Sequence, residues 1–139
     1  MFSVALVTSS TQHWEQQWSF LLSNFAPVSL FVLLGTLNRK VRPFADYVSV
    51  ETAEDLPSPL VLLTPKNGTY FAGETSLPEF NHPPYACYMF GSDNITLSTD
   101  HMGSRKPDHS VYVPTSTKDD MYSYMAGSVT FYDRMMKRG

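Results

Sequence analysis

The sequence predicts one α/β domain spanning residues 1–139, in which a mostly parallel sheet carries helices on both faces. Short apolar runs such as Leu60–Thr64 recur along the chain without the alternation of a half-exposed strand, which is typical of parallel strands buried on both faces. Segments with helical spacing lie between these runs. The hydrophobic content of 42% and the aromatic content of 14% are sufficient for one core.

Strands and helices are expected to alternate along the chain. A first strand is predicted at Phe2–Val7, and helical spacing then predicts a helix with one buried face, formed by Trp14, Trp18, Leu21, Leu22 and Phe25. Pro27 ends this helix because proline cannot continue it. Further strands are expected at Val28–Leu34, Tyr47–Val50, Leu60–Thr64, Ala86–Phe90 and Val111–Thr115, and helical turns at Thr52–Leu56 and Ser76–Phe80. Residues 94–110 are polar and irregular, which predicts a long loop.

A last helix is predicted at about Asp119–Lys137. Thr117 and Asp120 have the spacing of a capping box, and acidic residues suit a helix N-terminus. One face is apolar and consists of Met121, Tyr122, Met125, Val129 and Tyr132. The centre of the helix is lined by the small residues Ala126, Gly127 and Ser128, which would allow a strand, a partner helix or a ligand to approach closely.

The charge balance excludes a strongly basic protein. The formal net charge is -3 and the isoelectric point is about 5.7, so there is no overall positive field that would attract nucleic acid. A contact with RNA would need a local patch or a second protein. The densest basic cluster is Asn38–Arg42, which is either a solvated loop or a patch that contacts phosphates.

The single cysteine, Cys87, excludes an intramolecular disulfide, and no Cys/His cluster has the spacing of a zinc site. The N-terminus lacks a basic signal-peptide region, and the longest apolar run is far shorter than the roughly 20 residues of a membrane helix. We therefore expect a cytoplasmic protein with no metal and no membrane association.

Two strand ends predict a small pocket lined by main chain. The strand that ends on Gly91 is followed by Ser92 and Asp93, and the run Val111–Thr115 is stopped by Pro114. Ligands of open α/β sheets bind at the carboxyl ends of the strands. The expected pocket is formed by Gly91–Asp93, Val113–Thr115 and the start of the last helix. Walker, Gly-x-Gly-x-x-Gly, Gly-x-Ser-x-Gly and His-Glu-x-x-His motifs are absent from the sequence.

The same residues resemble a known family. Met89–Leu97 is similar to the Gly-x-Glu-x-x-Gly-Leu segment of SPOUT, or α/β-knot, RNA methyltransferases, in the branch that methylates ribose 2′-hydroxyls of tRNA and rRNA. Val111–Thr115 followed by Met121–Asp133 resembles the last motif of that family, an Ile-Pro-Met run and a helix that ends in a Tyr-Glu pair. The resemblance implies a C-terminal deep trefoil knot, S-adenosylmethionine as cofactor, tRNA or rRNA as substrate, and a homodimer that forms through the last helix.

Carried onto this sequence, the resemblance implies that the cofactor lies against Thr64, Gly91, Ser92, Val113, Pro114 and Met121. Asp93, Arg105 and Ser123 are the catalytic residues that it favours, and His101 is a further candidate. Phosphates of the RNA would be held by Arg39, Lys40 and Arg42.

The sequence also departs from the family. Residues 8–25 contain no Arg or Lys where 2′-O-methylating members carry an arginine, Asp93 replaces a glutamate, and Tyr122 replaces the asparagine of a Ser-Leu-Asn motif. An alternative is therefore a catalytically impaired member that binds RNA or a protein. A third hypothesis is an unknotted, flavodoxin-like nucleotide-binding domain.

Overall fold

The computed structural model describes residues 1–7, 12–33, 47–64, 75–91, 99–117 and 121–138. Within them, seven strands form one sheet in the order β3-β2-β1-β6-β4-β7-β5, and every neighbouring pair is parallel. The strands are β1 (Ser3–Val7), β2 (Ser29–Leu33), β3 (Val48–Val50), β4 (Leu60–Leu63), β5 (Thr75–Ser76), β6 (Cys87–Phe90) and β7 (His109–Tyr112). The predicted fold class, a parallel α/β sheet, is confirmed.

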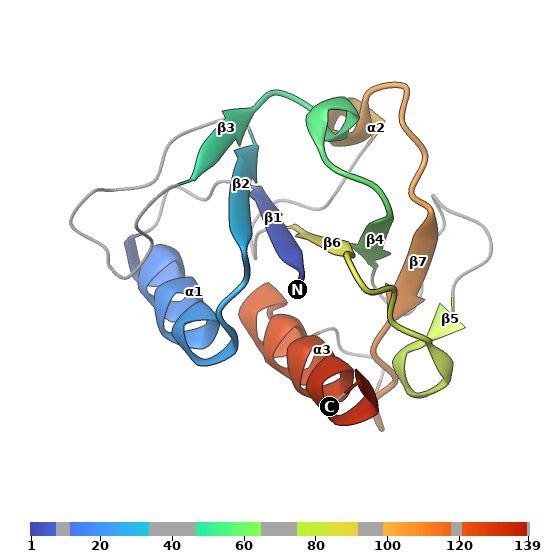
Figure 1. Cartoon of the computed structure of the whole chain (residues 1–139). Coiled ribbons are helices and arrows are strands. Elements are labelled where there is room, and N and C mark those ends of the chain that lie inside the picture. The colour runs from blue at the N-terminus through green and yellow to red at the C-terminus, as the bar shows by residue number, and fades with distance from the viewer. Residues whose placement is uncertain (8–11, 34–46, 65–74, 92–98, 118–120, 139) are drawn as a thin grey trace.

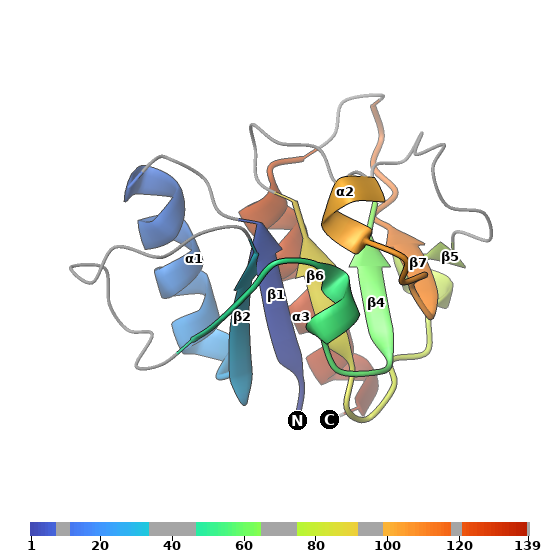
Figure 2. The ribbon, with the colours of Figure 1, turned by 90° about the horizontal axis from the view of Figure 1, so that it is seen from above.

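Helices cover both faces of the sheet (Figures 1 and 2). The helices α1 (Gln12–Phe25) and α3 (Ser123–Arg138) lie side by side on one face, together with the short helical turn η2 (Leu77–Glu79). The other face carries a second short turn, η1 (Ala53–Asp55), and the four-residue helix α2 (Thr99–Met102).

The core has one layer on each face because side chains of a strand point alternately to opposite sides. Val4 and Leu6 of β1 and Tyr88 and Phe90 of β6 pack under α1 and α3, together with Phe131. The opposite layer holds the intervening strand residues and the side chains that η1 and α2 contribute, among them Ala5, Val7, Leu60, Leu62, Met89, Ala53 and Met102. All residues of β4 and β6 are buried, which explains why their sequences are apolar without alternation.

The strand order does not fit the flavodoxin-like hypothesis. In a flavodoxin-like sheet, the first strand lies between the second and the third. Here β1 lies between β2 and β6, and β3 is an edge strand. The predicted knot depends on how residues 65–74 and 92–98 run relative to the last segment, and these residues lie outside the described part of the chain. The knot therefore remains a prediction.

Most predicted elements are found within one or two residues of their expected bounds. The elements missed are β5 and α2, and α2 lies inside the segment that was expected to be a loop. The last helix begins at Ser123, four residues later than predicted. Tyr122 supplies its first accepting carbonyl, since Ala126 N–H donates to Tyr122 O at 3.0 Å. Thr117, the capping residue of the predicted capping box, lies six residues before the helix start and does not cap it, and Asp120 lies outside the described residues.

The small centre of the last helix is explained by a contact with α1. A Cβ atom added to Gly127 would lie 2.7 Å from Cη2 of Trp18. The Trp18 ring is completely buried and packs at a tilt of 57° against Phe90, with 5.0 Å between the ring centroids. Of the three neighbours considered from the sequence, a strand, a partner helix or a ligand, the observed one is a helix, α1. The neighbour of Gly127 is a tryptophan of the same chain.

This contact predicts the effect of enlarging Gly127. The substitution Gly127→Val should lower the free energy of unfolding by about 1–3 kcal/mol, because Trp18 has no space into which it can move. Ser128→Val is a matched control, since Ser128 is the neighbouring residue on the same helix and is exposed. Urea unfolding of both variants measures the difference. Equal stability of the two variants would contradict the proposed contact.

Candidate functional site

The carboxyl ends of β4, β6 and β7 lie side by side at one edge of the sheet. Leu62 of β4 is in register with Met89 of β6 and with Ser110 of β7. Residues two positions further along each strand, Thr64, Gly91 and Tyr112, are therefore level with one another. Thr64 is tied to β7, since its N–H donates to Val111 O at 2.9 Å. Figure 2 shows the arrowheads of these parallel strands pointing to the same edge.

The start of α3 lies at this same edge. The C-terminal end of α3 is hydrogen-bonded at the opposite edge, to the carbonyl groups of Met1, Pro83 and Pro84. A helix of 16 residues is about 24 Å long and so spans the sheet. Its first residue, Ser123, and the preceding Met121 are both half-buried. The structure thus places Thr64, Gly91 and Val113 at the ends of β4, β6 and β7, with Pro114 in the segment after β7 and with Met121 and Ser123 at the start of α3.

Main chain and apolar side chains dominate this edge. Gly91 is half-buried and has no side chain to cover its own amide groups, whereas Pro114 is exposed and has no N–H to donate. Val113 packs partly against the core layer beneath α3. These residues suit a neutral, planar ligand that hydrogen-bonds to backbone groups beyond the last ladder bonds of the strands. Ser92 and Asp93 follow Gly91 in the sequence but lie outside the described residues.

Arg105 is not part of this group. Its guanidinium donates to the carbonyl groups of Ala53, Leu56 and Pro57 and to Ser58 Oγ, which lie in the segment that leads into the amino end of β4. Asp108 completes the arrangement, because its Oδ2 accepts from Leu60 N–H at 2.7 Å. Arg105 therefore anchors η1 at the start of β4, and we leave it out of the proposed site.

His101 lies on the face of the sheet opposite α1 and α3. It belongs to α2, and only 7% of its surface is exposed. The expected long loop is therefore replaced here by a short helix that covers the sheet.

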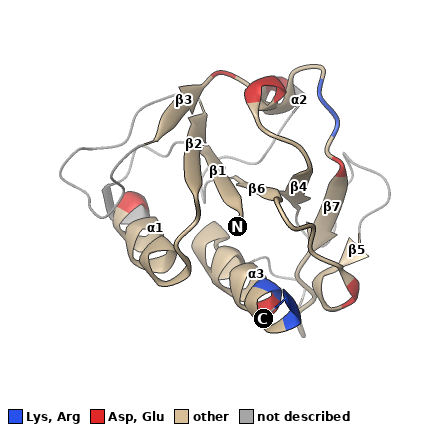
Figure 3. Cartoon of the chain, viewed as in Figure 1, with Lys and Arg blue, Asp and Glu red and all other residues tan. Residues whose placement is uncertain are grey.

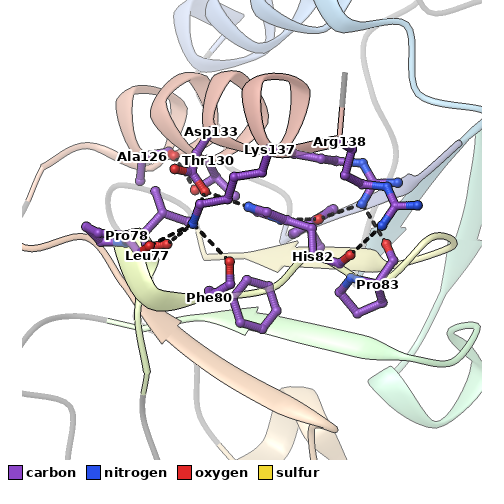
Figure 4. A network of polar contacts seen from close by, with 12 residues as sticks. Leu77, Pro78, Phe80, His82, Pro83, Ala126, Thr130, Asp133, Lys137 and Arg138 are labelled. Carbon is purple, nitrogen blue, oxygen red and sulfur yellow. Dashed lines mark hydrogen bonds and ion pairs between the residues drawn. The ribbon is translucent and has the colours of Figure 1, made fainter.

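A second group of polar residues lies at the amino edge and joins α3 to the segment before β6 (Figure 4). His82 Nε2 is 2.7 Å from Asp133 Oδ2, and Lys137 Nζ is 2.9 Å from the same oxygen. Lys137 also donates to the carbonyl groups of Leu77, Pro78 and Phe80. Figure 3 shows further charged residues at η1 and in the segment that leads into β7.

The hydrogen bonds of this group form one chain. Arg134 Nη1 donates to Tyr88 Oη at 3.0 Å, so the hydroxyl oxygen acts as an acceptor in that bond. The Tyr88 hydroxyl in turn donates its hydrogen to His82 Nδ1, with 2.7 Å between the oxygen and the nitrogen. His82 then carries its proton on Nε2 and donates it to Asp133. Arg134 is 5% exposed and also bonds to three backbone carbonyls, so its buried charge is well solvated by the protein. We assign this group a structural role.

Two further titratable groups are too deeply buried to act as nucleophiles. Burial raises the pKa of the Cys87 thiol to about 12, so the thiolate is not formed near neutral pH. Burial also raises the pKa of Tyr88 to about 12, although the charge of Arg134 opposes the shift. Neither group lies at the carboxyl edge.

The described residues contain neither a candidate metal centre nor a membrane-spanning helix. No group of three His, Cys, Asp or Glu side chains there could hold a metal ion. The helices of that part of the chain are also too short or too polar to cross a membrane.

Solved structures with the same fold include several described as RNA methyltransferases. TrmJ from Z. mobilis aligns with a TM-score of 0.77 and 14% identity over 99% of this chain and 70% of its own. A structure described as giving insights into the 2-OH methylation of C/U34 on tRNA aligns with a TM-score of 0.74 and 15% identity over 99% of this chain and 96% of its own. AviRb, a SpoU methyltransferase from Streptomyces viridochromogenes solved with the cofactor AdoMet, aligns with a TM-score of 0.73 and 13% identity.

The AviRb alignment covers 98% of this chain and 57% of AviRb, and the chain spans less than two thirds of several other matched structures. No protein-family model and no curated protein sequence matches the chain. At such low identity the likeness shows the fold, which is that of TrmH and SpoU methyltransferases. It thereby confirms the fold that the resemblance of the strand-end motifs implied.

The environment of His82 predicts how stability depends on pH. Burial lowers the pKa of His82 below its ordinary value of 6.5, and the hydrogen bond to Asp133 only partly offsets this. On acidification the unfolded chain therefore binds a proton at a higher pH than the folded protein does. The free energy of unfolding is largest above pH 6.5 and decreases as the pH falls below it. His82→Gln should be less stable at neutral pH but should lose less stability on acidification. Thermal unfolding between about pH 7.5 and pH 5 measures both effects, and parallel curves would refute the role of His82.

Proposed function

We propose that this chain is an S-adenosylmethionine-dependent methyltransferase that acts on ribose 2′-hydroxyls of tRNA or rRNA. The observation that carries the proposal is the carboxyl edge of β4, β6 and β7, which holds Gly91 of one resembling motif and Val113 of the other in a fold shared with RNA methyltransferases. Support comes also from the match over 96% of a chain described with 2-OH methylation of tRNA. AviRb and an rRNA methyltransferase from Sinorhizobium meliloti, which have the same fold, were solved with AdoMet.

The residues at this edge fit such a cofactor. Adenine has a planar ring that suits apolar walls, and its polar edge suits backbone N–H and C=O groups. We place the adenosine part against Thr64, Gly91, Val113 and Pro114, with Ser92 next to it in sequence. Met121 is half-buried at the start of α3 and would close the apolar side.

The reaction asks little of the protein beyond alignment and proton removal. When bound, S-adenosylmethionine supplies an activated methyl group on sulfur. The protein must hold the ribose hydroxyl in line with it and accept the hydroxyl proton. Asp93, two residues beyond Gly91, is the base that we propose. Ser123 at the helix start would orient the hydroxyl through a hydrogen bond.

Of the five basic residues in the described part of the chain, Lys106 is exposed and the other four are bound to the backbone. Arg105, Arg134, Lys137 and Arg138 all donate to backbone carbonyls, so they serve the fold. Arg39, Lys40 and Arg42 follow β2, whose carboxyl end lies at the same edge as the site. We propose that they contact RNA phosphates. A substrate of this kind would place the protein in the cytoplasm.

We also propose the trefoil knot and a homodimer. Both are implied by the family resemblance, and the dimer is supported by an exposed apolar face on α3, which we call the α3 stripe. Its side chains are between 41% and 63% exposed and follow helical spacing, namely Met125, Val129, Tyr132 and Met136. A helix face of this kind is the usual contact surface of a partner helix.

The dimer proposal predicts the effect of a charge on the α3 stripe. Tyr132→Glu should convert the dimer to a monomer, because a buried carboxylate without a partner costs several kcal/mol. Tyr85→Glu is the control, since Tyr85 is 67% exposed and lies just before β6 instead of on α3. Sedimentation velocity measures the mass of each variant. A wild-type monomer at micromolar concentration would disprove the dimer.

Calorimetry and a methylation assay test the enzymatic function. The wild-type chain should release or absorb heat on titration with S-adenosylmethionine, and it should form 2′-O-methylnucleosides in bulk tRNA or rRNA, detected by mass spectrometry. No heat with about 1 mM ligand would overturn the proposal, since such weak binding corresponds to only ~4 kcal/mol. Binding without methyl transfer would identify a protein that has lost catalysis.

The substitution Gly91→Val tests the position of the cofactor. The added side chain would occupy the space next to the cofactor, so affinity for S-adenosylmethionine should fall at least about tenfold. Ser128→Val introduces the same side chain on the exposed face of α3 and should leave the affinity unchanged. Unaltered binding by Gly91→Val would show that the cofactor does not lie next to Gly91 at the end of β6.

A further inference from the structure

Two tyrosines form a stacked pair at the start of the last helix. The rings of Tyr122 and Tyr124 are nearly parallel, with 12° between their planes and 6.3 Å between their centroids. Tyr124 packs partly against the core layer, so its ring is held in place. Tyr122 is 61% exposed although one side of its ring faces Tyr124. The pair therefore presents a supported aromatic surface to solvent.

This surface is distinct from the α3 stripe. Residues two positions apart on a helix point in nearly opposite directions and cannot stack. Tyr122 precedes the first helical residue and acts as its N-terminal cap, with its carbonyl accepting from Ala126 N–H. Its ring is consequently free to turn back toward Tyr124, on the core side of the helix. Met125 and Val129 of the stripe lie on the outer side.

The position of the pair points to the substrate. Tyr122 lies between Met121, which we place beside the cofactor, and Ser123, which we place beside the ribose hydroxyl. An exposed aromatic ring at such a place suits an unpaired nucleobase, because proteins that bind single-stranded RNA stack its bases on tyrosine, phenylalanine and tryptophan. The bases of an RNA duplex are already stacked on each other and cannot use such a surface.

We propose that Tyr122, supported by Tyr124, stacks on an unpaired base of the RNA next to the methylated nucleotide, so that the substrate is a single-stranded loop. This inference rests on the proposed methyltransferase function and specifies its substrate class. The ring selects for an unpaired base, whereas the cations discussed above bind phosphates of either form.

Binding of two RNA probes tests the proposal. Fluorescence anisotropy is measured with a labelled 12-nucleotide uridine RNA and with the same strand in a duplex with its complement. Tyr122→Ala should weaken binding of the single strand about 5- to 140-fold, the loss of one stacked base, and should change duplex binding little. Tyr122→Phe should bind as the wild type does. Tyr122→Leu, which is apolar but not planar, should be as weak as Tyr122→Ala.

Tyr85→Ala is the matched control, since Tyr85 is equally exposed but lies at the opposite edge of the sheet. Wild-type affinity in Tyr122→Ala or Tyr122→Leu, or an equal loss for both probes, would overturn the inference. So would a loss that accompanies dissociation of the dimer in sedimentation velocity, because Tyr122 would then contact a partner protein. Failure of the enzymatic proposal is separate, since it appears as absent heat with S-adenosylmethionine in the wild type.

Discussion

The placement of the last helix depends on the buried guanidinium of Arg134. It connects α3 to the carbonyl groups of Met1, Pro83 and Pro84 and to the hydroxyl of Tyr88, so one side chain ties the helix to the start of the chain and to the approach and centre of β6. Its charge also lies over the rings of Phe2 and Tyr88, at 5.3 and 5.8 Å from their centroids. A buried guanidinium with fewer hydrogen-bond acceptors would destabilise the folded state, so the loss of any one of these partners should weaken the attachment of α3.

The amino ends and the carboxyl ends of the strands consequently differ in their structural roles. Side-chain hydrogen bonds fix the amino edge, where His82, Asp133 and Lys137 hold the C-terminal end of α3. Strand ends and the N-terminal end of the same helix meet at the carboxyl edge, where backbone groups are available to a ligand. A helix that is held firmly at one end positions its other end accurately. The amino edge would thus supply the rigidity that the proposed site at the start of α3 needs to align a substrate.

Much of this architecture could be predicted from the sequence, because continuous apolar runs such as Leu60–Leu63 indicate buried parallel strands wherever they occur. The rule on strand ends also predicted that the ends of β6 and β7 lie at one edge, but not that β4 lies between them. Short elements could not be predicted, since β5 has two residues and exists through its pairing with β7. The role of Arg105 was equally hidden, because its partners are backbone carbonyls about 50 positions away in the sequence. Helix spacing predicted a single apolar face, but only the coordinates separate Tyr122 from it.

The burial of Cys87 has a practical consequence for work on this protein. It is the only cysteine of the chain, it is completely covered, and its raised pKa keeps it protonated. A cysteine introduced at an exposed position would therefore be the one thiol that reacts with a maleimide dye under native conditions. Fluorescent or spin labels can be attached at chosen positions without first removing the native cysteine, and the strand at the centre of the sheet stays intact.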